Sequence, residues 1–310
     1  MSLDRRNFIK SSVTSGAALL LASGSTQAAM KRPIAKPANF SIKIMATNWG
    51  FDGNSDQFCA KAKQAGYDGT EVGWLADESK RAELFGALKS NQLDYAFLVG
   101  VWGVPDYPAH FKNFEKSLRD AAATKPMYIN CHAGRDYYSY DQNKTFIDLT
   151  TRVSQEFHLP IYNETHRGRI LYSAPVAKTF LDKIPDLRLT LDISHWCAVH
   201  ESLLGDQTET IDLALRRTDH IHARVGHAEG PQVNDPRAPE WKQALETHLA
   251  WWDKVLDYKI KSGSSRLTFL TEFGPIDYMP ALPFCRQPVA NQWEINVYML
   301  QLLRARYAGK

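Results

Sequence analysis

The 310-residue chain has few cysteines and little net charge, and each shortage excludes a class of protein. Its four cysteines are widely spaced, with no C-x-x-C pair, so they predict neither a zinc knuckle nor a disulfide framework. The formal net charge is +3 at pH 7, and without residues 1–28 the chain keeps 34 basic and 33 acidic side chains, a net charge of +1. Such a chain has no general electrostatic field for nucleic acid or for an acidic membrane surface.

Long apolar runs are also missing, and a membrane-spanning helix needs about 20 consecutive apolar residues. The segment 13–24 is a short, mild apolar run that follows the paired Arg5 and Arg6 and precedes small residues up to Ala28. This order of charged, apolar and small residues resembles a twin-arginine export signal with cleavage near Ala28. We therefore expect residues 1–29 to be removed and the mature protein to be periplasmic. The alternative is a disordered basic N-terminus.

A dinucleotide-binding signature is absent as well, because no G-x-G-x-x-G follows the first predicted strand. The sequence instead alternates short apolar runs with helical stretches. The predicted strands occupy residues 40–49, 69–74, 94–103, 127–134, 159–166, 187–194, 220–225 and 266–273. Strict alternation implies parallel strands with crossover helices, and eight strands favour a closed barrel over an open sheet. We predict an α/β fold in which residues 30–310 form one (β/α)8 TIM barrel, a fold that usually takes about 250 residues.

Polar side chains stand at the ends of four successive predicted strands, namely Glu164, Asp192, His222 and Glu272. The first two separations are 28 and 30 residues, close to the roughly 30 residues of one βαβ unit. The carboxyl ends of barrel strands share one face, so these side chains are expected at one rim. Three carboxylates buried together repel one another strongly without a cation. We therefore predict that the four side chains bind one divalent metal ion, although each taken singly is more often a helix cap or an ordinary polar contact.

The same stretches resemble the xylose-isomerase-like barrel superfamily, also described as the sugar phosphate isomerase/epimerase family. The matching motifs are N-E-T-H-R-G-R at Glu164, D-x-x-H at Asp192 and His195, H-x-H at His220 and His222, and T-E-F-G at Glu272. That superfamily includes sugar isomerases, ketose 3-epimerases, inosose dehydratases and DNA repair enzymes of the endonuclease IV type. The resemblance implies that the four rim residues hold the metal, that His195 contacts substrate, and that Glu164 and Glu272 also carry protons.

One position departs from the sugar-epimerase pattern. Those enzymes have an arginine six residues after the metal-binding histidine, where this chain has Ala228, and Arg224 lies nearer to His222.

Three carboxylates and one imidazole favour Mn²⁺, Mg²⁺, Co²⁺ or Zn²⁺ over copper. Such an ion would act as a Lewis acid while a base removes the proton from the carbon next to a carbonyl. The candidate bases are Glu164, Glu272 and His166, and the candidate substrate contacts are His195, Arg224, His132, Trp49, Glu71 and Trp196.

These expectations combine into an enzyme that acts on a keto-sugar or a 3-keto-glycoside through an enediolate, by epimerisation, isomerisation or β-elimination. The 3-keto-glycoside part depends on the H-R-G-R stretch and on segment 273–299, which resemble exported isomerase/epimerase-type proteins. An endonuclease IV-like metallo-phosphodiesterase is one alternative, because His132 and Glu71 could supply part of a second ligand set. A barrel that binds sugar without turnover is another. We expect a small carbohydrate partner rather than nucleic acid or a membrane, and the oligomeric state stays open.

Overall fold

The computed structural model describes residues 36–307, so the predicted signal peptide at residues 1–29 lies outside the described part. Residues 37–300 form one compact unit that contains the whole barrel. Of a second unit, the structure describes Lys36 and residues 301–307, the end of helix α11 (Gln292–Tyr307). None of the helices within 36–307 combines the length and the apolar character that crossing a membrane requires.

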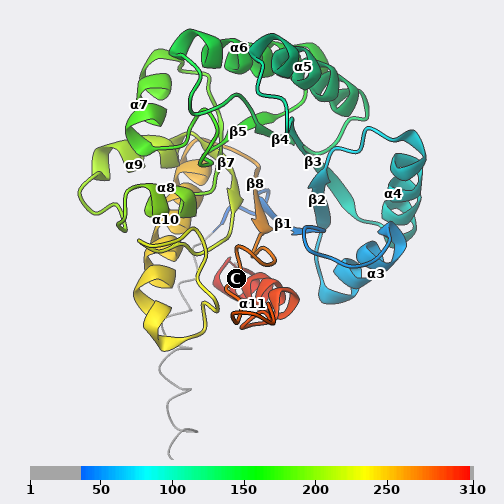
Figure 1. The fold of residues 1–310 in the computed structure, drawn as a ribbon, viewed down its shortest axis with the longest axis vertical. Helices are drawn as coiled ribbons and strands as arrows, with labels where there is room; N and C mark the ends of the chain where they lie inside the picture. Colours follow the sequence, from blue (N-terminus) through cyan, green and yellow to red (C-terminus); the bar gives the residue numbers. More distant parts are fainter. Residues whose placement is uncertain (1–35, 308–310) are drawn as a thin grey trace, which may run out of the picture. The chain divides into compact units, whose positions relative to one another are not determined.

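Eight parallel strands pair in chain order and close into a barrel (Figure 1). The strands are β1 (Ser41–Thr47), β2 (Gly69–Gly73), β3 (Asp94–Gly100), β4 (Ile129–His132), β5 (Ile161–Glu164), β6 (Leu189–Leu191), β7 (Thr218–His222) and β8 (Arg266–Thr271). Closure comes from β1 and β8, which pair from Ser41 with Arg266 to Ala46 with Thr271. The prediction of a (β/α)8 barrel is confirmed.

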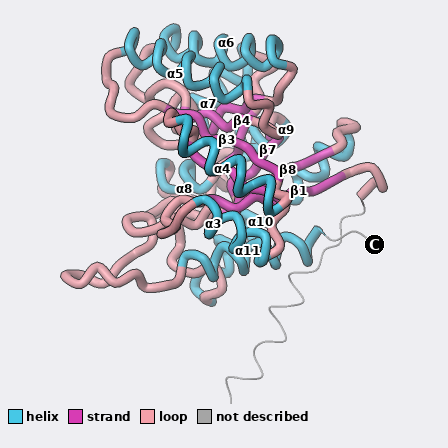
Figure 2. The backbone as a smooth tube through the Cα atoms, turned by 90° about the vertical axis from the view of Figure 1, so that its right-hand side faces the viewer, coloured by secondary structure: helices cyan, strands magenta, loops and turns pink. Residues whose placement is uncertain are grey.

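Helices follow the strands and surround the barrel, and α5 and α6 lie side by side (Figures 1 and 2). Their bounds are α3 (Ser55–Ala65), α4 (Glu78–Asn91), α5 (Tyr107–Ala123), α6 (Tyr140–Phe157), α7 (Ala174–Lys183), α8 (Ser194–Val199), α9 (Thr208–Arg216) and α10 (Lys242–Lys261), with a 3-10 turn η1 (Pro239–Trp241). Local sequence sets several of these ends. Ser139 caps α6 in a capping box with Gln142, which satisfies backbone N–H groups that the first turn leaves free.

The barrel interior is apolar below the rim. Met45, Ala96, Tyr128, Tyr162 and Leu270 form a buried cluster contributed by different strands. The Tyr128 hydroxyl lies 3.2 Å from Nε2 of a histidine in β7, so this apolar layer ends directly at polar groups. The packed interior therefore supports the polar side chains that stand at the carboxyl ends of the strands.

Strand β6 is shorter than the segment 187–194 predicted for it, because helix α8 begins at Ser194. The D-x-x-H motif consequently spans the end of β6 and the first turn of α8. His195 lies in this helix and not in a loop, and it is fully buried. Trp196 is also fully buried, and its indole N–H donates to the carbonyl of Leu171 at 2.9 Å. Trp196 therefore packs in the core and, although predicted as a substrate contact, does not line the cavity at the carboxyl ends of the strands.

Candidate functional site

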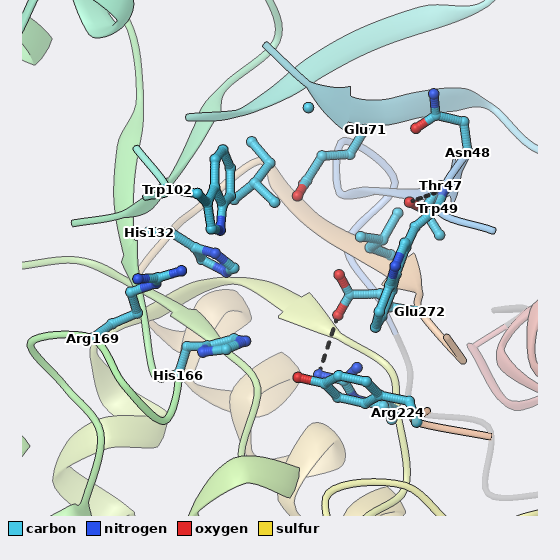
Figure 3. A pocket seen from close by; sticks show the side chains of 14 residues that line it. Thr47, Asn48, Trp49, Glu71, Trp102, His132, His166, Arg169, Arg224 and Glu272 are labelled. Atoms are coloured by element: carbon cyan, nitrogen blue, oxygen red, sulfur yellow. Dashed lines mark hydrogen bonds and ion pairs between the residues drawn. The ribbon is translucent and has the colours of Figure 1, made fainter. Parts of the chain in front are cut away.

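The carboxyl ends of the strands surround a cavity of about 450 Å³, within the size range of small-molecule sites. One side of the cavity carries Trp102, His132, His166 and Arg169, and the other carries Trp49, Glu272 and Arg224 (Figure 3). The mixture of aromatic rings with charged and imidazole groups suits a polar ligand with flat apolar faces.

The four predicted metal ligands come together beside this cavity, and of the four only Glu272 lines it. Asp192, His222 and Glu272 present ligand atoms that lie within 4.8 Å of one another. Glu164 Oε1 lies 3.7 Å from His222 Nδ1, and Glu272 Oε2 lies 2.8 Å from the same nitrogen. All four side chains are buried, with Glu272 the most exposed at 8%. The expected convergence of strand ends therefore occurs, with His222 at its centre.

The donor set fits a divalent ion. Glu164 Oε1 is buried and has no hydrogen-bond partner within residues 36–307, so its lone pairs are available. Both oxygens of Asp192 already accept hydrogen bonds, Oδ1 from Ser194 and Oδ2 from Arg224. Each carboxylate oxygen has two lone pairs, so these contacts leave room for a metal bond. Carboxylate oxygens with one imidazole are ligands that Mn²⁺, Mg²⁺, Co²⁺ and Zn²⁺ accept.

A buried arginine supplies positive charge that the sequence argument did not consider. Arg224 is 1% exposed, forms an ion pair with Asp192, and has Nη2 3.5 Å from Glu272 Oε2. Burial raises the pKa of Asp192 to about 6, although Arg224 acts in the opposite direction. Arg224 already offsets part of the negative charge of these carboxylates, and a divalent ion would offset more of it. Repulsion between the carboxylates is therefore not by itself a reason to require a metal. The case for a metal depends on the positions of the donor atoms.

Glu71 contacts two histidines of strand β7. Its Oε1 lies 3.2 Å from His222 Nε2, and its Oε2 lies 3.0 Å from His220 Nε2. His220 Nδ1 lies 2.7 Å from the hydroxyl of Thr268. Burial would raise the pKa of Glu71, but His222 and His220 hold it well below its usual 4.5. Burial would lower the pKa of His222, but Glu272, Glu164 and Glu71 raise it well above 6.5, so both ring nitrogens carry protons that face carboxylates. A metal bound at Nδ1 would replace that proton and leave Nε2–H donating to Glu71, as in metal-binding histidines generally.

The candidate bases lie on both sides of the cavity. Glu164 Oε2 accepts from the Asn130 amide at 2.6 Å and lies 2.9 Å from His132 Nε2. His166 packs its ring against His132, with ring centres 4.3 Å apart. Burial, and then the charge of His132, lower the pKa of His166 well below 6.5, so its imidazole is neutral and can accept a proton.

The predicted substrate contacts differ in how they face the cavity. Trp49, Glu71, His132 and Arg224 line it. His195 does not line it, because its ring lies behind His166 with centres 3.8 Å apart and its Nε2 is 2.9 Å from Arg224 Nη2.

Sequence reasoning missed three residues of the site. Tyr278 lines the cavity and meets Trp49 edge-on, with ring centres 4.8 Å apart. Arg169 also lines the cavity, and Asn130 holds Glu164 from β4. Arg169 belongs to the H-R-G-R stretch, which was a visible signal. Tyr278 lies in segment 273–299, a second visible signal, whereas Asn130 stands in no pattern that separates it from other asparagines.

No protein-family model and no curated protein matches the chain. Solved structures do match. A D-allulose 3-epimerase from Methylomonas sp., in complex with D-allulose, gives a TM-score of 0.59 at 18% identity and covers 89% of this chain and 100% of its own. The likeness shows a shared (β/α)8 barrel fold.

Two further structures agree with this assignment of the fold. The 3-keto-D-glucoside 4-epimerase YcjR from E. coli gives a TM-score of 0.53 at 15% identity, over 85% of this chain and 99% of its own. A xylose isomerase-like TIM barrel protein from Mycobacterium smegmatis, in complex with magnesium, gives a TM-score of 0.53 at 12% identity. The match covers 84% of this chain and 96% of the other. At such identities the likeness concerns the fold, and activity is a separate question.

Proposed function

We propose that the protein is a divalent-metal-dependent isomerase or epimerase that acts on a keto-sugar or a 3-keto-glycoside. The observation that carries the proposal is the convergence of Asp192, His222 and Glu272, with Glu164 beside them, next to a cavity that Glu272 lines. Similar folds support the sugar class, because one relative is named for D-allulose and another for a 3-keto-D-glucoside. The Mycobacterium smegmatis barrel protein, which was solved in complex with magnesium, supports the dependence on a divalent metal.

Glu164, Asp192, His222 and Glu272 would hold the ion, which when bound stabilises negative charge on a substrate carbonyl oxygen. Glu272 faces the cavity and removes the proton from the carbon next to the carbonyl. His166 lies across the cavity from Glu272 (Figure 3) and, being neutral, shuttles a proton to the opposite face of the sugar. Glu164 is the third proton carrier. Return of the proton to the opposite face gives epimerisation, return to the neighbouring carbon gives isomerisation, and loss of a β-substituent gives elimination.

Deuterium uptake tests this proposal. Protein loaded with Mn²⁺ is mixed in deuterated buffer with D-allulose, D-fructose and a 3-keto-D-glucoside, and uptake is followed by mass spectrometry. We expect metal-dependent uptake at the carbon next to the carbonyl, and loss of uptake in Glu272→Gln. Glu209→Gln is the matched control, because that glutamate side chain is 91% exposed on α9. Full activity of Glu272→Gln would remove Glu272 from the mechanism, and no uptake from any sugar would favour a barrel that only binds.

A metallo-phosphodiesterase of the endonuclease IV type is the second candidate. Two further groups favour it, Glu71–His220–His222 and His132–Glu164–His166, because each brings ligand atoms within 4.8 Å. The near-neutral charge of the chain argues against a DNA substrate. Nicking of a plasmid that contains abasic sites would establish this activity, and intact plasmid at high enzyme concentration would exclude it.

We also propose a periplasmic location, on the basis of the sequence of residues 1–29 alone. Replacement of Arg5 and Arg6 by lysine should retain the protein in the cytoplasmic fraction of a host with a twin-arginine pathway. Unchanged fractionation would contradict the export signal.

A further inference from the structure

Two arginines lie near each other beside the cavity, and Arg169 lines it. Arg135 follows β4 and Arg169 follows β5, next to Trp102. Figure 3 shows Arg169 with Trp102, His132 and His166, across the cavity from Glu272. This side of the cavity is the side away from Arg224.

Arg135 is built into the fold and does not move freely. It is 8% exposed, and its guanidinium donates to the carbonyls of Gly134 at 3.1 Å and Val101 at 2.6 Å. Its backbone is fixed by the buried Asn143 of α6, which exchanges two hydrogen bonds with it. Gly134 has a φ of +55°, and a Cβ there would lie 2.3 Å from Asn143 Oδ1, so the loop requires glycine.

Neither guanidinium has an acidic partner. Throughout residues 36–307, no carboxylate lies within 4.0 Å of Arg135 or Arg169, whereas the buried Arg224 pairs with Asp192. Arg169 Nε is buried and makes no hydrogen bond with the described residues. Burial, and then the charge of Arg135, lower the pKa of Arg169, and the pKa of the nearby His110 falls to about 4 through burial and the same two arginines.

Buried charges in folded proteins are normally paired, so an unpaired guanidinium that lines a cavity indicates a ligand of opposite charge. The planar guanidinium of arginine matches carboxylate and phosphate oxygens in a two-point hydrogen bond. Burial and the charge of Arg135 lower the pKa of Arg169, and they outweigh Glu164 and Asp136, both more than 4.0 Å away, which raise it. Arg169 is therefore a cation without a carboxylate in contact.

We infer that Arg169, supported by Arg135, binds an anionic substituent of the substrate, a carboxylate or a phosphate. The substituent would be carried on the sugar at the end away from Glu272. This inference rests on the proposed function and narrows its substrate class from keto-sugars in general to anionic keto-sugars. The ring face of Trp102 beside Arg169 would pack against the carbon that bears the anion.

Three ketoses that differ only at C6 test the inference: D-fructose, D-fructuronate and D-fructose 6-phosphate. Their dissociation constants are measured by calorimetry, with and without Mn²⁺. At least one anionic ketose should bind about tenfold or more tightly than D-fructose, and which one does so distinguishes carboxylate from phosphate. Arg169→Gln should weaken that ligand by about ten- to a hundredfold and so remove its advantage over D-fructose, and Arg169→Lys should keep part of the preference.

Arg152→Gln, on the outer face of α6 with a side chain 61% exposed, is the matched control and should bind all three ketoses like wild type. The inference is overturned if D-fructose binds as tightly as both anionic ketoses, if the preference persists in Arg169→Gln, or if neither anionic ketose binds at 10 mM. Binding requires no turnover. Wild type that prefers an anionic ketose but shows no deuterium uptake from that ketose or from the neutral sugars would therefore overturn the proposed function and leave this inference intact.

Discussion

Replacement of Glu71 by glutamine should weaken metal binding without removing any predicted metal ligand. Glu71 Oε1 accepts from Nε2 of His222 at 3.2 Å, and its Oε2 lies 3.0 Å from His220. Glutamine keeps the size of the side chain but replaces one oxygen by an N–H₂ group, which cannot accept a proton donor. One of the two imidazoles then faces another donor and must rotate or shift its proton. If His222 does so, Nδ1 no longer presents its lone pair to the metal.

The magnitude follows from the hydrogen bond that is lost. A hydrogen bond to a charged group contributes about 1.5–3 kcal/mol. Its loss corresponds to an affinity for the metal ion that is roughly 10- to 150-fold weaker. Partners behind metal-binding histidines have effects of about this size, 10- to 100-fold. Mn²⁺ affinity is measured by competition with a chelator, and the Co²⁺ absorption spectrum reports any change of geometry around the ion.

The reasoning would be refuted if Glu71→Gln bound Mn²⁺ within twofold of wild type with an unchanged Co²⁺ spectrum. Glu209→Gln serves as the exposed control and should bind normally. Melting of the metal-free proteins separates this effect from a general loss of stability, because a misfolded variant would melt early even without metal.

Two predictions concern stability. Trp196→Ala should lower the free energy of unfolding by about 3–5 kcal/mol in chemical denaturation, because the side chain is fully buried; a weaker sugar affinity with unchanged stability would instead make Trp196 a ligand contact. Arg188 and Lys259 pair with Asp219 and, against the effect of burial, lower the pKa of Asp219 below its ordinary 3.8. A lowered pKa stabilises the fold above pH 3.8, and this contribution is lost as the pH falls through the folded pKa. The loss of unfolding free energy in Asp219→Asn should therefore be full at pH 5 and shrink below pH 3.8. A deficit independent of pH would contradict this pairing.

The barrel was predictable because its signals are local and repeated. Short apolar runs at regular spacing define parallel strands, and the steps of 28 and 30 residues from Glu164 to Asp192 to His222 place these side chains at one rim. The direction of each side chain beyond the strand end was not predictable in the same way. Asp192 accepts hydrogen bonds from Ser194 as well as from Arg224, so it both shapes the start of α8 and takes part in the site.

Contacts between distant segments account for what the sequence did not reveal. Trp196 follows His195 directly, yet the helical turn of α8 directs its indole into the core against Leu171. The ion pair of Arg224 with Asp192 joins residues 32 positions apart and depends on side-chain conformations that no spacing encodes. Among residues 36–307, Arg135 and Arg169 have no carboxylate within 4.0 Å. This could be recognised only from the positions of all neighbouring carboxylates in the fold.

A divalent ion at the proposed site would share Asp192 and Glu272 with Arg224, and this leads to a prediction in which two measurements move in opposite directions. The guanidinium is paired with Asp192 and lies 3.5 Å from Glu272, so it offsets the carboxylates in the metal-free protein. Arg224→Gln leaves buried carboxylates without that partner, and breaking a buried ion pair costs about 3–5 kcal/mol. The metal-free variant should therefore melt well below wild type.

The same substitution removes a positive charge that repels the ion and competes for Asp192. The same excess of Mn²⁺ should consequently raise the melting temperature of Arg224→Gln by more than it raises that of wild type, because stabilisation by a ligand of the folded state grows with the logarithm of its affinity. Arg152→Gln controls for the loss of an exposed arginine. If Arg224→Gln proved as stable as wild type without metal, the carboxylates would not need the guanidinium. If Mn²⁺ raised its melting temperature less than that of wild type, Arg224 would assist the metal site and would not compete with it.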